Sequence, residues 1–135
     1  MVPFKNLSAY PGEPPREGDP RKIPGGPLYT LSEVQSLTHQ PGALNLWTRR
    51  CSTTVAALGL DTDDVGALIR ELTERDYRDS EWCENGRGAW AACDAYTLRR
   101  LEFRETVGKS FATEYYLKFA LAKTGALLLM VSCHT

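Results

Sequence analysis

The chain ends in the run LLLMVSCHT, in which an apolar stretch stops at Cys133 and His134. This ending allows three interpretations: the tail of a buried strand, a metal site made by the Cys-His pair, or a catalytic group at the edge of a sheet. Side chains of a strand alternate between its two faces, so Cys133 and His134 are expected to point in opposite directions and not to share a metal ion. Structural zinc also needs four converging ligands, and a site that adds Cys83 and Cys93 would lack the usual closely spaced pairs. We therefore expect no metal and no cofactor.

The strand before this ending is predicted from the segment ATEYYLKFALA, which residues 123–125 separate from ALLLMVSCH. The two segments predict an antiparallel hairpin. With a loop of residues 124–126, three expected pairs are Tyr116–His134, Lys118–Ser132 and Phe119–Val131. The odd-numbered face is then uniformly apolar, and a slip of one residue would mix apolar and polar positions. The pattern therefore predicts a polar cluster on the even-numbered face, made of Tyr116, Lys118, Ser132 and His134.

A phenol, an ammonium group and an imidazole side by side have the functional groups for cleaving RNA without a metal ion. Attack of a 2′-hydroxyl on the adjacent 3′-phosphate needs a base, an acid for the leaving oxygen, and positive charge beside the phosphorane. Histidine and tyrosine serve in proton transfer, and lysine or arginine stabilises the charge. The alternative is that these side chains are ordinary solvent-facing strand residues, among which tyrosine is common. The spacing by itself leaves both interpretations open.

The composition is that of one globular domain of modest size. The 135 residues include 42% hydrophobic and 24% charged residues, with a net charge of −1. No stretch has the length of a membrane helix, and the N-terminus lacks the pattern of a signal peptide, so we expect a cytoplasmic protein with no membrane partner. In that compartment the four scattered cysteines are expected to be reduced thiols, mostly in the core.

Charge is distributed unevenly along the chain. Residues 61–86 contain nine Asp and Glu against three Lys and Arg, whereas residues 87–135 contain seven Lys and Arg against four Asp and Glu. A basic face can contact a phosphate backbone even when the whole chain is near neutral. The C-terminal part is therefore the one expected to contact nucleic acid, with only a small excess of positive charge.

The order of the predicted elements is helices first and strands afterwards. Residues 1–27 contain seven of the eight prolines and are expected to form either a disordered tail or an extended arm on a single domain of residues 28–135. Helices are predicted after Thr30 with a capping box to Glu33, after Thr48, and after Asp61 or Thr62. Asn85-Gly86 marks a hairpin turn, and residues 98–111 could be a loop or another hairpin. We expect an α+β fold in which two to three N-terminal helices pack on one face of an antiparallel sheet.

Several runs, in order from about Tyr29 to His134, resemble the MqsR family of bacterial mRNA interferase toxins, which have the RelE-like fold. YTLSEVQSL is similar to the family's first helix, and TRRCSTTVAALGLDTDDVGALIRELTERDY to its second and third helices. DAY at residues 94–96 resembles a central strand, YYLKF resembles a Tyr-aliphatic-Lys strand, and LLLMVSCH resembles the closing strand. The resemblance implies three helices against a curved antiparallel sheet. It also implies metal-independent cleavage of mRNA, a cognate antitoxin partner that blocks it, and no DNA binding by the toxin alone.

Some of the family's functional positions are retained and others are changed. Tyr116 and Lys118 match the family's strand tyrosine and lysine, and His134 stands where the family has its C-terminal catalytic lysine. Asp79 replaces another family lysine, next to Arg78. Because adjacent strand residues face opposite ways, Arg78 could replace that lysine only if a β-bulge re-aims it.

The family's glutamine is absent, since Cys93 occupies that position, or Ala91 if the match is centred on Trp90. We expect the catalytic residues to be Tyr116, His134, Lys118 and Arg78. The expected substrate-binding residues are Arg99, Arg100, Trp90 and Ser132. The competing hypothesis is a diverged, catalytically weak family member that mainly binds a protein, through the Pro-rich arm and the acidic residues 61–84.

Overall fold

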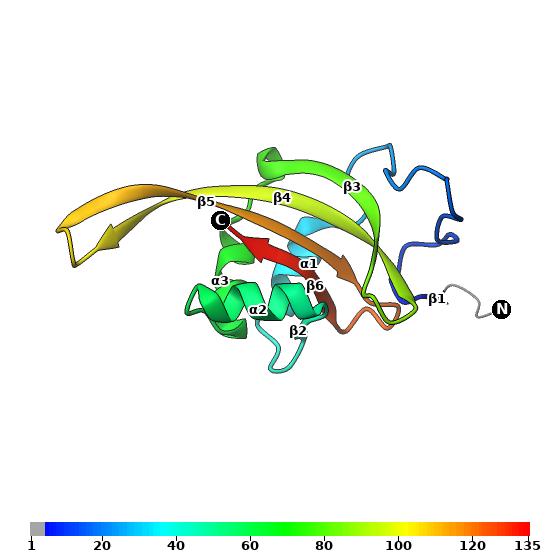
Figure 1. The fold of residues 1–135 in the computed structure, drawn as a ribbon, viewed down its shortest axis with the longest axis horizontal. Coiled ribbons are helices and arrows are strands. Elements are labelled where there is room, and N and C mark those ends of the chain that lie inside the picture. The colour runs from blue at the N-terminus through cyan, green and yellow to red at the C-terminus, as the bar shows by residue number, and fades with distance from the viewer. Residues whose placement is uncertain (1–4) are drawn as a thin grey trace.

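The structure is a computed structural model in which residues 5–135 are described, so the first four residues of the expected arm lie outside the described part. Those 131 positions form an α+β fold with three helices and a curled mixed sheet (Figure 1). The helices are α1 (Leu31–Leu37), α2 (Arg49–Ala57) and α3 (Thr62–Glu71). The strands are β1 (Lys5–Asn6), β2 (Leu44–Leu46), β3 (Tyr77–Glu84), β4 (Ala89–Arg104), β5 (Lys109–Leu121) and β6 (Leu128–His134).

The sheet is mixed, which corrects the expectation of a purely antiparallel sheet. Its strand order is β1-β4-β5-β6-β2, with β3 also paired to β4. The long neighbours β3–β4, β4–β5 and β5–β6 are antiparallel as predicted, but β1 pairs with β4 and β2 with β6 in parallel. The expected order of helices before strands is wrong for the same reason, because β1 precedes α1 and β2 lies between α1 and α2. Strands of two and three residues are too short to show a period of two in the sequence.

The helix ends follow the expected capping at two of three positions. The Thr48 hydroxyl accepts a hydrogen bond from the Cys51 amide at 3.1 Å and begins α2. Asp61 and Asp64 form a reciprocal capping box at the start of α3, with both bonds at 2.9 Å. The side chain of Thr30 makes no capping hydrogen bond, so the capping box expected at α1 is absent. In Figure 1 the three helices lie below the arch of β3, β4 and β5.

The closing hairpin has the predicted register at its far end and a bulge in its middle. Tyr116 pairs with His134 and Lys118 with Ser132, as expected. The pairing shifts after Lys118, so Phe119 faces Met130 and Val131 is the extra residue of the bulge. One extra residue reverses which side chains face the core. For this reason Met130, on the expected polar face, is fully buried.

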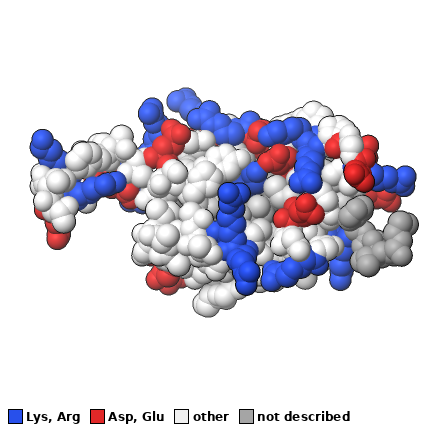
Figure 2. Space-filling model, in the orientation of Figure 1, with Lys and Arg blue, Asp and Glu red and all other residues white. Residues whose placement is uncertain are grey.

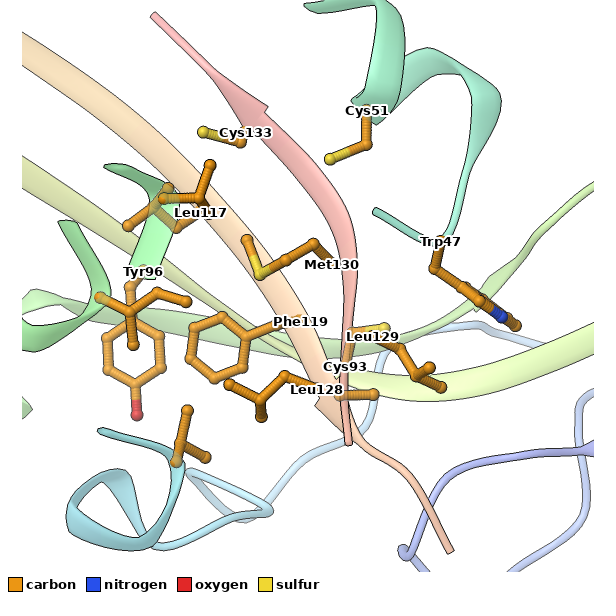
Figure 3. Packing of buried hydrophobic residues seen from close by; sticks show 14 of the residues in the cluster. Trp47, Cys51, Cys93, Tyr96, Leu117, Phe119, Leu128, Leu129, Met130 and Cys133 are labelled. Carbon is orange, nitrogen blue, oxygen red and sulfur yellow. The ribbon is translucent and has the colours of Figure 1, made fainter. Parts of the chain in front are cut away.

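The core lies between the sheet and the helices. Tyr96 of β4 stacks on Phe119 of β5 with ring centroids 5.5 Å apart, and Leu117, Leu128 and Met130 surround the pair (Figure 3). All four cysteines are free thiols, and Cys51, Cys93 and Cys133 are buried. Cys133 therefore belongs to the core, as alternation predicts.

Residues 5–28 run along the sheet rather than away from it. The amide of Ile23 donates to the Ser80 carbonyl and the amide of Trp82 donates to the Arg21 carbonyl, both at 2.9 Å. Tyr10 packs edge-on against Trp82, with ring centroids 5.8 Å apart. These contacts carry Arg21 and Lys22 to the edge of β3. The boundary predicted at residue 27 stays a prediction.

Residues 98–111 form the outer part of a long hairpin. The sequence allows either a loop or a hairpin for this segment. Strands β4 and β5 stay paired from Asp94–Phe119 to Arg104–Lys109, and Figure 1 shows this part projecting beyond the helices. None of the helices in residues 5–135 is long and apolar enough to span a membrane.

Candidate functional site

The predicted pair of Tyr116 and His134 is formed on the outer face of the sheet. Thr97 of β4, Tyr116 of β5 and His134 of β6 lie in one cross-strand row. The rings of Tyr116 and His134 stack with centroids 5.1 Å apart and an interplanar angle of 26°. Tyr116 is half-buried and His134 is exposed. A phenol and an imidazole are thus held together at a surface that a substrate can reach.

Arg78 reaches this row through a β-bulge. The register of β3 against β4 shifts between Tyr77 and Asp79, which leaves Arg78 as the extra residue. Its Nε donates a hydrogen bond of 2.8 Å to the hydroxyl oxygen of Thr97. Because Thr97 is the β4 neighbour of Tyr116, the bulge directs the guanidinium toward the Tyr116 row. The bulge is the change of direction without which Arg78 would follow the ordinary alternation of the strand.

Lys118 lies in the next row of the same face, and its charge is already paired. It is buried, and its ammonium donates to the Glu81 carboxylate of β3. Burial lowers the pKa of Lys118, but the hydrogen bond to Glu81 and neighbouring negative charges outweigh it, so the net pKa is raised. Lys118 Nζ is 5.5 Å from the Tyr116 ring centroid. The lysine is therefore a fixed cation beside Tyr116 and a poor donor of its proton.

Asp79 of β3 belongs to the same charge network. Its carboxylate is 2.5 Å from Lys22 Nζ, and Lys22 Nζ is 3.5 Å from Glu81. Burial raises the pKa of Glu81. The hydrogen bond from Lys118 and the charge of Lys118 lower this pKa by a larger amount, so the net pKa lies below its ordinary value. Two carboxylates and two ammonium groups thus balance one another next to the site.

The structure brings together only part of the expected substrate-binding set. Ser132 faces Lys118 across the hairpin, and Arg99 is exposed on the outer face, 3.4 Å from Glu114. Arg100 lies on the opposite face, where it is 3.2 Å from Glu71 of α3. Adjacent strand residues point to opposite faces, which separates Arg100 from Arg99.

Trp90 is also away from the site. It is buried in a small cluster with Trp82 and Ala92, on the face opposite Tyr116, and Arg21 lies 4.9 Å from its ring centroid. The tryptophan packs under residues of the N-terminal segment such as Tyr10 and Ile23. This placement separates it from the row of Tyr116 and His134.

Cys133 is buried in the core, whereas its neighbour His134 is exposed. Within residues 5–135 no group of three or more His, Cys, Asp or Glu side chains is arranged to hold a metal ion. The side chains at the site are instead suited to proton transfer and to stabilising negative charge.

Three residues beside the site were missed by the sequence analysis: Glu81, Arg49 and Arg50. Glu81 had no visible partner in the sequence, since Lys118 is far along the chain. Arg49 and Arg50 occupy the first turn of α2, where cations oppose the positive end of the helix dipole. That mismatch is the sequence signal that could have marked the two arginines. The chain matches no protein-family model and no curated protein.

Proposed function

We propose that this protein is a metal-independent endoribonuclease of the RelE-like, MqsR-type class, which cleaves mRNA in the cytoplasm and is held inactive by a cognate antitoxin. The observation that carries the proposal is the row in which Tyr116 stacks on His134 while a bulge directs Arg78 toward it. The three helices below the curled sheet, with a Pro-rich arm before them, fit a RelE-like arrangement.

In the proposed reaction the neutral His134 imidazole accepts the proton of the RNA 2′-hydroxyl. The 2′-oxygen then forms a bond to phosphorus, and the bond from phosphorus to the 5′-oxygen breaks. The Tyr116 phenol donates a proton to that leaving oxygen, which yields a 2′,3′-cyclic phosphate and a 5′-hydroxyl. The Arg78 guanidinium stabilises the charge on the phosphorane.

Cleavage of RNA by the purified protein in the presence of a chelator tests this proposal. We expect wild type to cleave, and we expect Tyr116→Phe and His134→Ala each to lower the single-turnover rate by about 10²–10⁴-fold, the usual contribution of a general acid or base. The matched control is His39→Ala, which removes the chain's other histidine from an exposed turn. Cleavage that survives both site substitutions would overturn the assignment of the site.

A second function is favoured by the charges beside the site. Lys118 is neutralised by Glu81, and Asp79 has no positive charge to offer a phosphate. These features fit a diverged member with little activity that acts as a protein-binding module. Exposed apolar side chains on the outer hairpin, such as Leu101 and Phe103, provide a contact surface for it. This alternative predicts that wild type fails to cleave RNA even in large excess over substrate.

A further inference from the structure

A surface groove lies between the start of α2 and the end of the β3–β4 hairpin, next to the proposed active site. It has a volume of about 590 Å³. We call it the arginine groove, and its relevant lining residues are Arg21, Arg49, Arg50, Glu81, Val131 and Ser132. Three arginines from two distant parts of the chain thus line one groove, together with Val131 and Ser132 of β6. Arg49 and Arg50 lie in the first turn of α2, where their charge opposes the helix dipole and does not stabilise the helix through it.

The positive charge of the arginine groove is only partly compensated. Arg49 and Arg50 are exposed and form no ion pair with any Asp or Glu of residues 5–135. Arg21 is 3.4 Å from Glu84, but both side chains are about half exposed, so this contact is weak. Glu81 is neutralised by Lys118. Figure 2 shows a column of Lys and Arg side chains near one end of α2, with acidic side chains beside it.

The arginine groove continues toward His134. A second hollow of about 370 Å³ adjoins it and shares Arg50, Val131 and Ser132 with it. His134 also lines this second hollow. A ligand strand that places one phosphate beside His134 can therefore extend along β6 past Ser132 to Arg50 and Arg49.

We propose that the arginine groove binds the phosphate backbone of single-stranded RNA beside the cleavage position. Guanidinium groups bind phosphate oxygens bidentately, so Arg49 and Arg50, which form no ion pair within residues 5–135, suit a polyanion. This inference rests on the proposed function for the identity of the ligand, although binding does not require cleavage. The groove positions the strand, whereas Tyr116 and His134 act on it.

Binding of a labelled RNA single strand of about 12 nucleotides tests the proposal. The parent protein carries His134→Ala so that the RNA stays intact, and fluorescence anisotropy gives affinity at several salt concentrations between about 50 and 200 mM. In that background we expect Arg49→Ala/Arg50→Ala to weaken binding by about tenfold or more at the low-salt end. We also expect the slope of log affinity against log salt to become less steep by about 0.7 for each phosphate group that the variant no longer neutralises.

The matched control is Arg70→Ala/Arg75→Ala, which removes the same charge from exposed positions outside the groove. We expect it to change affinity less than about threefold, which separates binding in the groove from the effect of net charge. Equal effects of the two double variants, or no effect of either, would overturn the proposal. Arginine-dependent binding of an acidic peptide without binding of RNA would also overturn it, in favour of a protein ligand.

Two further measurements identify the source of the phosphate and separate this proposal from the proposed function. Displacement of RNA by millimolar inorganic phosphate would show a small-anion site and overturn a backbone site. Groove-dependent binding by a wild type that does not cleave would support the groove while contradicting the nuclease. Cleavage by wild type with an unchanged affinity in the Arg49→Ala/Arg50→Ala variant would support the nuclease and contradict the groove.

Discussion

Two neighbouring rows on the outer face of the sheet use charge in opposite ways. The Tyr116 row contains Arg78, Thr97, Tyr116 and His134, and the Lys118 row contains Asp79, Ala95, Lys118 and Ser132. In the Lys118 row each charged group has an opposite charge beside it, from Glu81 or Lys22. In the Tyr116 row neither Arg78 nor His134 has an ion pair within residues 5–135.

The difference between the rows shows that Lys118 stabilises the fold, whereas Arg78 and His134 are available to a ligand. Lys118 matches a lysine of the family that the sequence resembles. Its buried ammonium is nevertheless bound to the Glu81 carboxylate and holds β5 to β3. Arg78 and His134 stand where the resemblance has other residues, but they are exposed and face solvent. For these positions, the interaction partner of a side chain in the folded protein therefore indicates its role better than a match in residue type does.

The largest effect that separates the rows is expected from Arg78. We expect Arg78→Ala to lower RNA cleavage by about 10²-fold, because the variant has no guanidinium to stabilise the phosphorane. Thr97→Val keeps the guanidinium but removes its hydrogen-bond partner, so it is expected to have a smaller effect. Single-turnover rates measure both, and Arg75→Ala, in the short 3₁₀ helix Glu74–Asp76 before β3, is the control. If Thr97→Val were as damaging as Arg78→Ala while lowering stability, the bulge would be structural only.

A change in the Lys118 row is expected to affect stability first. Glu81→Gln leaves the buried Lys118 ammonium without its carboxylate, and we expect the free energy of unfolding to fall by about 1.5–3 kcal/mol. The control Asp79→Asn breaks only the exposed pair with Lys22 and is expected to cost less than about 1 kcal/mol. Urea unfolding near neutral pH measures both. Equal reductions would contradict the distinction between the buried and the exposed pair.

The same pair predicts how stability depends on acid. The net pKa of Glu81 in the folded protein lies below its ordinary 4.5, so folding favours the ionised carboxylate. Its contribution is therefore present above the unfolded pKa and is lost as the pH falls through the folded pKa. We expect the stability difference between wild type and Glu81→Gln to be constant near neutral pH and to shrink below about 4.5. A difference that grows on acidification would contradict this assignment.

The smallest effects are expected from two arginines that adjoin in sequence but face opposite ways. Arg99→Ala removes one exposed cation from the outer face, and we expect RNA affinity to fall by a few-fold. Arg100→Ala breaks a partly exposed pair with Glu71 on the helix side, so it is expected to leave RNA affinity unchanged and to cost less than about 1 kcal/mol of stability. Anisotropy and urea unfolding compare the two. An effect of Arg100→Ala on affinity as large as that of Arg99→Ala would contradict the assignment of faces.

Much of the local structure could be predicted because its causes lie within a few residues. The cap of α2 at Thr48, the cap of α3 at Asp61, and the turn at Asn85-Gly86 each depend on near neighbours. The pairing of Tyr116 with His134 was predicted because only one register keeps apolar residues on one face. The predicted capping box at Thr30 is wrong. The amides of Glu33 and Val34 donate to the Thr30 carbonyl, and the Thr30 side chain makes no capping bond.

The sequence by itself determined the helix starts after Thr48 and Asp61, the hairpin turn at Asn85-Gly86, the pairing of Tyr116 with His134 and the opposite directions of Cys133 and His134. Only the tertiary structure decided where the bulges at Arg78 and Val131 fall, because one extra residue leaves no local signal and is positioned by its partner strand. It also decided that Glu81 binds Lys118 and that Arg21 lines the same groove as Arg49 and Arg50. These interactions join residues far apart in the chain, so they arise only when the sheet curls and the N-terminal segment packs along β3.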